Sequence, residues 1–489
     1  MPGEQELQPA APQEKLPLKA IVVSDLHLGE ACSVFSAGDG PDVSFCAEAG
    51  AALARLIASG LSPGQQRAEY LVLAGDVLDL SLGSRASAFL GFKALLAHLA
   101  ALFDALIYVP GNHDHHIWVA LQEEARIFAQ IREGQPVLPY YDALIPTIDH
   151  EGLVLPTPIA GGQAGPLPTR PIGRRTFLYQ LLPAAARDRQ MDFLVAYPNV
   201  HLRLEAQRTL VTHGHFFEDA WTLFTDALPS SLGAQTLTYE ELERFNSPFT
   251  EFGWYHLGQA GALSEILERI WREFQSSPRV LPPTLEQVAE EVAGFVDERL
   301  DFTPAQKTGL RRFFASRIEA PVKEWSSDRV VHLWLEVLNR FVMSQLKLYE
   351  GDIEPGSALR DTPDMFADPR KAAKVRRYLR MAENAADPFR PTALVFGHTH
   401  VPTVLTALET DTGTVITHNT GGWLVDNSDP LLLSISRPSI VAIDEGGALR
   451  HIPVPWPTES EFWKAAAGCS PEASRREAKR LVQATLHGI

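Results

Sequence analysis

Five short apolar runs in this sequence each end in residues that can bind a metal ion or carry a proton. The runs AIVV, YLVLA, ALIYVP, TLVT and ALVF pass directly into SDLH, GDVLD, GNHD, HGH and GHTH. Short β-branched and aliphatic runs of this kind are typical of buried strands. The ligand-type residues that follow them are Asp25 and His27, Asp76 and Asp79, Asn112 and His113, His213, and His398 and His400.

The donor atoms of this set indicate a class of metal. Carboxylate, amide and imidazole groups suit Mn, Fe, Zn, Ni or Co, and no cysteine stands among them to select a thiolate-binding ion. A single Asp or His at a strand end is more often a cap or a satisfied polar group. We call the five segments SDLH, GDVLD, GNHD, HGH and GHTH stations. Five stations in order are a stronger signal than one residue, because burying so many carboxylates and imidazoles without a metal would leave costly unpaired groups. Two divalent ions would fit this set.

The elements between the runs predict how these residues meet. The segments SFCAEAGAALARLIAS and SAFLGFKALLAHLAALF separate the first three runs and have helical periodicity. Strands that alternate with helices are typical of α/β folds, in which the helices cross over a parallel sheet. Residues just past the strand ends of such sheets gather along one rim, which is where open α/β sheets place their sites.

The neighbours of these stations are expected to have supporting roles. His115 and His116 are interpreted as loop histidines near the mouth of the site, with a smaller chance of touching substrate. His215 is expected beside the ligands rather than among them, and Asp114 is expected to brace its own turn. Asn419, at another strand end, could contact the rim or stabilise a turn.

The pattern along the chain predicts an interrupted core. Segments such as LSEILERIWREFQ and DRVVHLWLEVLNRFVMSQLKLYE have helical spacing and lie between the HGH and GHTH stations, whereas GTVITHNTGGWLV and SIVAIDEGG resemble strands. A Pro-rich crossing, IPVPWPTE, and a short C-terminal helix follow. The expected units are a disordered tail at 1–18, a core at 19–215 and 392–455, a helical insertion (a lid or cap) at 216–391, and a C-terminal helical extension at 456–489.

Composition narrows the class of protein. The chain has 489 residues and a formal net charge of −17, so a protein that coats nucleic acid is disfavoured, because such binding needs clustered Lys and Arg. Cys32, Cys46 and Cys469 are scattered without a CxxC pair, which fits a reducing cytoplasm. We expect no secretory signal and no transmembrane segment, because the apolar stretches are broken by polar residues and proline.

The ordered stations D-x-H, GD-x-x-D, GNHD, H and GH-x-H resemble those of the calcineurin-like metallophosphoesterases. The resemblance covers Lys19 to His215 and Thr392 to Pro453. It implies an α/β fold in which a two-sheet sandwich is flanked by helices, with a dinuclear metal centre at the strand ends. It also implies in-line hydrolysis of a phosphate ester, either a phosphomonoester, a phosphodiester or a pyrophosphate, by a bridging, metal-bound hydroxide.

The same resemblance implies a role for each residue. Asp25, His27 and His400 would hold one metal ion, Asn112, His213 and His398 would hold the other, and Asp76 would bridge both. His113 would protonate the leaving oxygen or bind the phosphate. Asp79 would orient the His113 imidazole and raise its pKa.

Within that family the sequence is partly similar to UDP-2,3-diacylglucosamine diphosphatases, which carry a shorter helical lid in the same slot. It departs from their pattern at His215 and Val401. Two alternatives stay open: a nucleotide phosphodiesterase or nuclease of the same fold, and a non-catalytic metal-binding scaffold. The expected partner is a small phosphorylated or lipid-linked substrate, and nucleic acid is not expected.

A basic segment near the end of the insertion suggests a further contact. In PRKAAKVRRYLR, read as a helix, Arg370, Lys374 and Arg377 share one face. This face is either solvated, or it holds an anionic headgroup or rests on an anionic membrane surface as a peripheral contact. The oligomeric state and the native metal are not predicted by the sequence.

Overall fold

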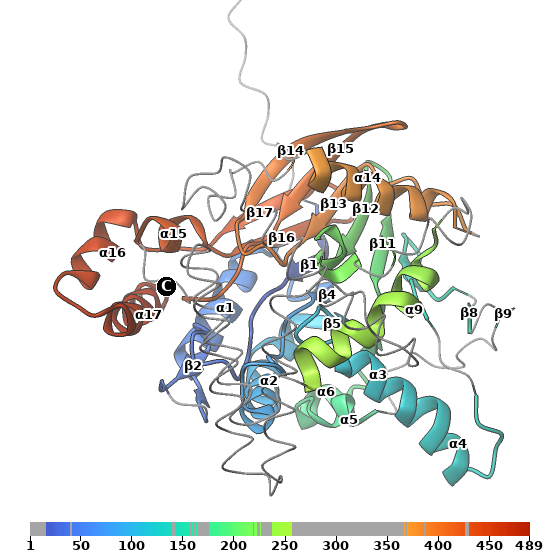
Figure 1. Ribbon diagram of the computed structural model, residues 1–489, viewed down its shortest axis with the longest axis horizontal. Coiled ribbons are helices and arrows are strands. Elements are labelled where there is room, and N and C mark those ends of the chain that lie inside the picture. The colour runs from blue at the N-terminus through green and yellow to red at the C-terminus, as the bar shows by residue number, and fades with distance from the viewer. Residues whose placement is uncertain are drawn as a thin grey trace, which may run out of the picture.

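The computed structural model describes residues 16–489, apart from 40–41, 139–141, 157–158, 161–162, 165–175, 219, 223–224, 226–236, 257–365, 367–368, 386 and 426–429. Two large sheets form the centre of the fold (Figure 1). Both sheets contribute to one cluster of buried apolar side chains, which includes Val22 and Leu71 from the first and Val211 and Leu394 from the second. This mixed α/β architecture confirms the predicted fold class.

The first sheet contains the strands that lead to the SDLH, GDVLD and GNHD stations. Its neighbours β1, β4, β5 and β10 run parallel, whereas β16 pairs antiparallel with β1 and β17 pairs antiparallel with β16. Chain far from the N-terminus therefore completes this sheet. Its order is β10 (Asp192–Val195), β5 (Phe103–Val109), β4 (Ala68–Ala74), β1 (Leu18–Val23), β16 (Ser439–Asp444) and β17 (Leu449–Pro453).

The second sheet carries the HGH and GHTH stations. Strands β12, β13 and β15 are parallel neighbours, so the stations after β12 and β13 leave the same edge of the sheet. Its order is β14 (Thr403–Thr410), β15 (Gly413–Asn419), β13 (Ala393–Phe396), β12 (Arg208–Thr212), β11 (Asn199–Arg203), β6 (Thr147–Ile148) and β7 (Leu153–Val154). Two small hairpins pair β2 (Ser36–Ala37) with β3 (Ser44–Phe45) and β8 (Ile159–Ala160) with β9 (Gln163–Ala164).

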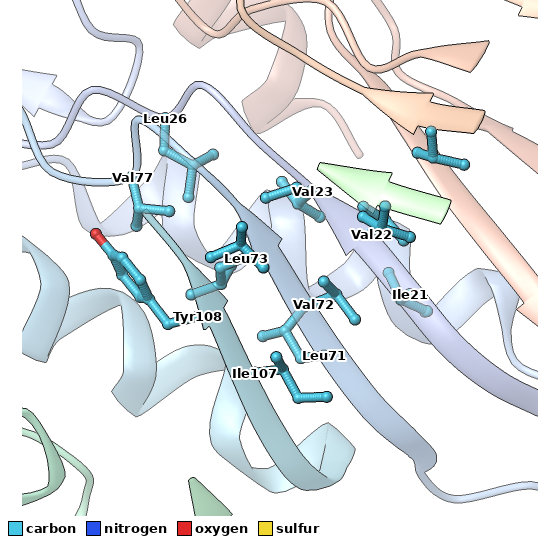
Figure 2. Packing of buried hydrophobic residues seen from close by; sticks show 14 of the residues in the cluster. Ile21, Val22, Val23, Leu26, Leu71, Val72, Leu73, Val77, Ile107 and Tyr108 are labelled. Atoms are coloured by element: carbon cyan, nitrogen blue, oxygen red, sulfur yellow. The ribbon is translucent and has the colours of Figure 1, made fainter. Parts of the chain in front are cut away.

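Strands of the first sheet align their apolar side chains in rows. Val22, Val72 and Ile107 are register partners across β1, β4 and β5, and all three are fully buried (Figure 2). Strands with both faces covered need such continuous aliphatic runs, which is the pattern that the sequence shows. Because β1, β4 and β5 are aligned in this register, the stations that follow them lie side by side.

Helices α1 (Ala47–Gly60) and α2 (Arg85–Leu99) connect the first three strands, as the periodicity predicts. In α2 the buried residues include Phe92, whose ring meets that of Tyr108 on β5 at 5.7 Å. Within the described part of the chain, Arg85–Leu102 is the one helical segment long and apolar enough to cross a membrane by length and composition. A core helix passes the same test, and the buried residues of α2, which include Phe92 and Leu96, belong to the apolar cluster to which both sheets contribute.

Short elements surround the sheets. Before β10 they are η1 (Ala100–Leu102), α3 (His116–Glu123), η2 (Glu124–Phe128), α4 (Ala129–Arg132), α5 (Phe177–Gln180) and α6 (Ala184–Asp188). After β12 they are η3 (His215–Phe217), η4 (Ala220–Thr222), α9 (Tyr239–Thr250), η5 (Glu251–His256) and α14 (Pro369–Glu383). The chain ends with α15 (Pro430–Ile435), α16 (Glu459–Ala466) and α17 (Pro471–His487).

The described parts of the insertion are helical, in α9, η5 and α14. The helices expected from LSEILERIWREFQ and DRVVHLWLEVLNRFVMSQLKLYE lie outside the described residues. Helix α14 packs on the second sheet, where the Tyr378 hydroxyl hydrogen-bonds to Asn199 and lies 3.1 Å from the Thr212 hydroxyl.

Two sequence expectations near the C-terminus were too simple. The run IPVPWPTE begins inside strand β17, and proline is tolerated there because β17 lies at the edge of its sheet. The single C-terminal helix is two helices, α16 and α17. Between them Gly468 has φ +77° and Pro471 begins α17, so the chain cannot continue as one helix.

Helix α17 fastens the chain that follows the SDLHLGE segment. The Lys479 ammonium group is buried and donates hydrogen bonds to the carbonyl oxygens of Ala31 (2.7 Å) and Gly38 (2.8 Å). The Gln483 amide donates to those of Val34 (2.8 Å) and Ser36 (3.1 Å). The last helix of the chain thus supplies hydrogen-bond donors to four backbone carbonyls of residues 31–38.

We predict that Lys479→Met destabilises the protein by about 1–3 kcal/mol, because the buried Lys479 ammonium group is lost and the part-buried carbonyl groups of Ala31 and Gly38 lose a charged donor. Amide hydrogen exchange should speed up in residues 31–38. The matched control is Arg480→Met, which removes a side chain that is 69% exposed, and its effect should stay within about 0.5 kcal/mol. Equal unfolding midpoints for the two variants in chemical denaturation would contradict this role of Lys479.

Candidate metal centre

The predicted ligands stand where the strands end, on an unusual backbone. Asp25, His27, Asp76, His398 and His400 all have positive φ, between +46° and +72°. Gln190 is the sole further non-glycine residue with positive φ in the described ranges. A non-glycine residue in this region is strained by its Cβ, and such strain gathers at functional sites. The chain turns sharply here, which aims side chains out of the strand direction.

Glycines make room for the ligands. Gly75 has φ +90°, and Gly111 lies against Asp76, where a Cβ on Gly111 would come within 2.7 Å of the Asp76 backbone nitrogen and of Cδ2 of His213. Real Cβ atoms do not approach so closely. The glycine before Asp76 and the glycine before Asn112 are therefore part of the site's geometry.

One group of ligands joins the first station to the last. Asp25, His27 and His400 offer donor atoms that all lie within 4.8 Å of one another. His400 Nε2 lies 3.4 Å from Asp25 Oδ1 and 3.3 Å from His27 Nε2. Imidazole nitrogens that face each other at this distance repel unless one carries a proton or a cation lies near them both. These three residues could hold a metal ion, although His27 and His400 are 373 positions apart in sequence.

A second group lies beside the first. Asp76, His213 and His398 also place donor atoms within 4.8 Å of one another. His213 Nε2 lies 3.1 Å from Asp76 Oδ2 and 3.0 Å from Asn112 Oδ1. Its Nδ1 lies 3.1 Å from the carbonyl oxygen of Ala74, and a hydrogen bond there leaves Nε2 as the nitrogen that faces the ligands.

Charge in this site is concentrated and buried. Asp25, Asp76 and Asp79 have exposed fractions of 0%, 1% and 0%. Burial alone would raise the pKa of Asp76, yet the neighbouring imidazoles of His213 and His113 hold it well below its ordinary range. Carboxylates that stay ionised in a buried place need positive charge beside them. Divalent metal ions would supply that charge, and the donor set fits them.

His113 and Asp79 form the predicted pair. His113 Nδ1 lies 3.0 Å from Asp79 Oδ2 and 2.8 Å from the Ser81 hydroxyl. Burial would lower the pKa of His113, but the carboxylates of Asp79 and Asp76 outweigh it and raise that pKa to about 10. Cations bound nearby would oppose this rise, because like charge disfavours imidazolium. His113 also joins His27 and Asp76 in a further group of convergent donors, so geometry alone leaves both a proton-donor role and a ligand role open to it.

The turn after Asp79 holds that carboxylate in place. Asp79 Oδ1 accepts hydrogen bonds from the backbone N–H groups of Ser81 (3.0 Å), Leu82 (2.6 Å) and Gly83 (3.2 Å). Its other oxygen, Oδ2, lies between His113 Nδ1 and His27 Nδ1, the latter at 3.1 Å. Asp79 therefore orients a predicted ligand as well as the predicted catalytic histidine.

The supporting residues lie as follows. Asp114 braces its turn, because it accepts from the backbone N–H groups of Gly111 (2.6 Å) and Val77 (2.8 Å) and from the Tyr108 hydroxyl (2.5 Å). Asn419 contacts the GHTH station itself, because its side-chain amide donates to the Gly397 carbonyl (3.2 Å) and to the Thr399 hydroxyl (2.7 Å). His215 packs beside the ligand rings, with its centroid 5.5 Å from that of His213.

The structure adds residues that the sequence reading did not single out. Glu218 Oε2 lies 3.1 Å from His398 Nε2, which leaves Nδ1 of His398 as the nitrogen able to bind metal. Burial would raise the pKa of Glu218, but His398, Lys371 and Lys374 lower it to about 2. Glu30 joins His27 and Asp79 in another convergent group. Glu30 and Glu218 come shortly after their stations, in SDLHLGE and HGHFFE. This proximity in sequence is the signal that could have identified them as site residues.

His115 and His116 contact the insertion. His115 lies between Glu243 and Glu251, and His116 Nδ1 lies 2.7 Å from Glu251 Oε2. The basic face of α14 also makes internal contacts. Lys374 donates to the Thr222 hydroxyl at 2.7 Å, while the Arg370 side chain lies outside the described residues. The headgroup or membrane contact of this helix stays a prediction.

Comparison with known proteins agrees with this geometry. A family model described as calcineurin-like phosphoesterase matches residues 18–248. No curated protein matches the chain. The matched range includes the stations from SDLH to HGH, and strand pairing places the GHTH station beside them. On the family match and the site's geometry together, residues 18–248 form a calcineurin-like phosphoesterase region.

Proposed function

We propose that this protein is a metal-dependent hydrolase of phosphate esters whose two divalent ions share the carboxylate of Asp76. The observation that carries the proposal is the position of that carboxylate. Asp76 Oδ2 lies 3.1 Å from Nε2 of His213 in the second ligand group and 3.8 Å from Nε2 of His27 in the first. A carboxylate oxygen has two lone pairs, so Oδ2 of Asp76, which faces both ligand groups, could serve two ions at once.

In this proposal each remaining ligand serves one ion. Asp25, His27 and His400 would hold the first, and Asn112, His213 and His398 would hold the second. Two bound divalent ions supply an activated water and stabilise charge on the attacking and leaving oxygens of an in-line displacement. Asp79 keeps the His27 ring oriented through Nδ1, and Glu218 does the same for His398 through Nε2.

His113 handles the proton of the leaving group. Its Nδ1 is held by Asp79 and Ser81, so a proton for the leaving oxygen has to come from Nε2. The Asp79 carboxylate favours the protonated ring, which makes His113 a general acid rather than a base. Its backbone N–H donates to Asp76 Oδ1 at 2.8 Å, so the acid and the shared carboxylate are held in one geometry.

The kind of phosphate bond is the open part of the proposal. A panel of phosphomonoesters, phosphodiesters and pyrophosphates, each supplied with Mn, Fe, Zn, Ni or Co, would identify the substrate class. Chelation should abolish hydrolysis of every substrate that the protein accepts. Salt-sensitive binding of DNA would instead favour the nuclease alternative.

We predict that Asp76→Asn lowers metal content below that of any other single ligand variant and abolishes hydrolysis. The reason is that one substitution weakens the binding of both ions, so the loss in affinity should exceed the about 10–100-fold that an outer hydrogen bond contributes. Elemental analysis of purified protein measures this. The control is Asp104→Asn, at a carboxylate that is 56% exposed. Near-normal metal content and turnover in Asp76→Asn would overturn the shared-carboxylate proposal.

A second prediction separates proton transfer from metal binding. His113→Ala should keep its metal ions and lose roughly 10²–10⁴ in turnover. The loss should shrink for esters with strongly acidic leaving groups, because these need no protonation, and Asp79→Asn should lose less. The exposed His150 gives the control, His150→Gln. Loss of metal from His113→Ala would show that His113 is a ligand.

A further inference from the structure

Two carboxylates of the insertion enclose the histidine that follows the GNHD station. Glu251 Oε1 lies 2.5 Å from His115 Nδ1, and Glu243 Oε1 lies 2.9 Å from His115 Nε2. The second oxygen of Glu251 lies 2.7 Å from Nδ1 of His116. Glu251 thus bridges two consecutive histidines, and one carboxylate lies on each side of the His115 ring.

This cluster is an ion-pair network and not a further metal site. The two nitrogens of His115 point to opposite edges of its ring and face different carboxylates, so the donors do not converge on one point. Each nitrogen that faces a carboxylate must donate a hydrogen, so the ring carries both protons and a positive charge. His115 and Glu243 are 1% and 5% exposed. Breaking one partner of a buried pair is strongly destabilising locally, because it leaves an uncompensated charge.

The network reaches the loop that carries Asn112 and His113. On its inner side this loop is held by Asp114, which accepts from Gly111 and Val77. On its outer side the His115 side chain is gripped by the insertion, and the His115 carbonyl accepts from the Trp118 N–H (2.8 Å) at the start of α3. The position of His113 is therefore set between the core and the insertion.

The same stretch of the insertion also touches the other half of the His113–Asp79 pair. Tyr255 on η5 stacks on His116, with ring centroids 3.5 Å apart and planes 9° apart. Its hydroxyl accepts a hydrogen bond from Arg85 Nη1 at 2.7 Å, and the Arg85 guanidinium lies over the Tyr255 ring at 4.9 Å. Arg85 begins α2, directly after the turn whose N–H groups hold Asp79. One segment, residues 243–255, spans both loops.

We propose that Glu243 and Glu251 are positioning residues: by clamping His115 and His116, the start of the insertion holds His113 at the place where it protonates the leaving oxygen. The inference rests on the proposed function for its chemical part. Its structural part, a catalytic loop ordered by the insertion, stands on the contacts alone. The insertion is then a component of the catalytic machinery, whatever else its remaining residues bind.

The test uses the full-length, metal-loaded protein and the isosteric variants Glu243→Gln and Glu251→Gln. Both should keep the metal content of the parent. Amide hydrogen exchange should speed up in residues 111–118 and stay unchanged in the loop of Asp25. Turnover of an ester with a weakly acidic leaving group should fall about 10–100-fold, the cost of misplacing a catalytic group by about 1 Å. Turnover of a nitrophenyl ester should fall much less, with KM unchanged.

A double-variant comparison separates positioning from general damage. Added to His113→Ala, the Glu251→Gln change should cost little further turnover, because its effect acts through a side chain that is already absent. Additive losses would overturn the proposal. The matched control is Arg244→Gln, which breaks an ion pair of α9 with Asp142 (2.5 Å) one residue from Glu243, and which should match the parent in every measurement.

The outcomes distinguish the two proposals. If the loaded parent hydrolyses none of the panel while exchange in residues 111–118 still responds to Glu251→Gln, the proposed function fails and the clamp stands. If the parent is active but both variants match it in exchange and in leaving-group dependence, the clamp fails alone. Loss of metal from the variants, with parent-like exchange, would assign Glu243 and Glu251 to metal binding and also overturn the positioning role.

Discussion

Negative charge held out of water at the strand ends is the constraint on which the rest of this structure depends. Three carboxylates, those of Asp25, Asp76 and Asp79, are 0–1% exposed. Isolated ionised groups in such a place would be very unfavourable, so each must be matched by imidazole, by backbone N–H groups or by bound cations. The left-handed backbone at the ligands, the glycines before Asp76 and Asn112, and the meeting of two sheets at one rim all place those partners within reach.

Side chains from later parts of the sequence contact the loops that carry the predicted ligands, and each of these contacts stabilises a different loop. Lys479 of α17 satisfies the carbonyl groups that follow the first station. Glu243 and Glu251 grip the loop of the third, and Glu218 orients His398 of the fifth. Loops of this kind carry function because they are free of ladder hydrogen bonds, and for the same reason they need support from elsewhere. Here the support comes from the insertion and the C-terminal extension.

The sequence predicts those site residues whose signal is local, and it does not predict partners that lie far away along the chain. Asp25, Asp76 and His113 could be identified because an apolar strand and its terminal ligand are neighbours in sequence, and the same pairing recurs along the chain. The partners of those residues could not. Glu251 stands 136 positions from His115, and it is one of 60 acidic residues, so no local pattern separates it from a solvated charge on a helix. The same holds for Lys479, whose carbonyl partners lie 448 and 441 positions away.

The acidic balance of the protein gives these local arrangements a functional meaning. A chain with net charge −17 repels a phosphate ester at long range, so attraction must arise within the site itself. Imidazolium at His113 and divalent ions held by the ligand groups would reverse the field over a few ångströms. Three of the acidic residues contact histidine rings and orient them: Glu218, Glu243 and Glu251. Behind a predicted ligand, as Glu218 lies behind His398, negative charge strengthens imidazole as a donor to metal, and so an acidic protein can build a centre that attracts anions.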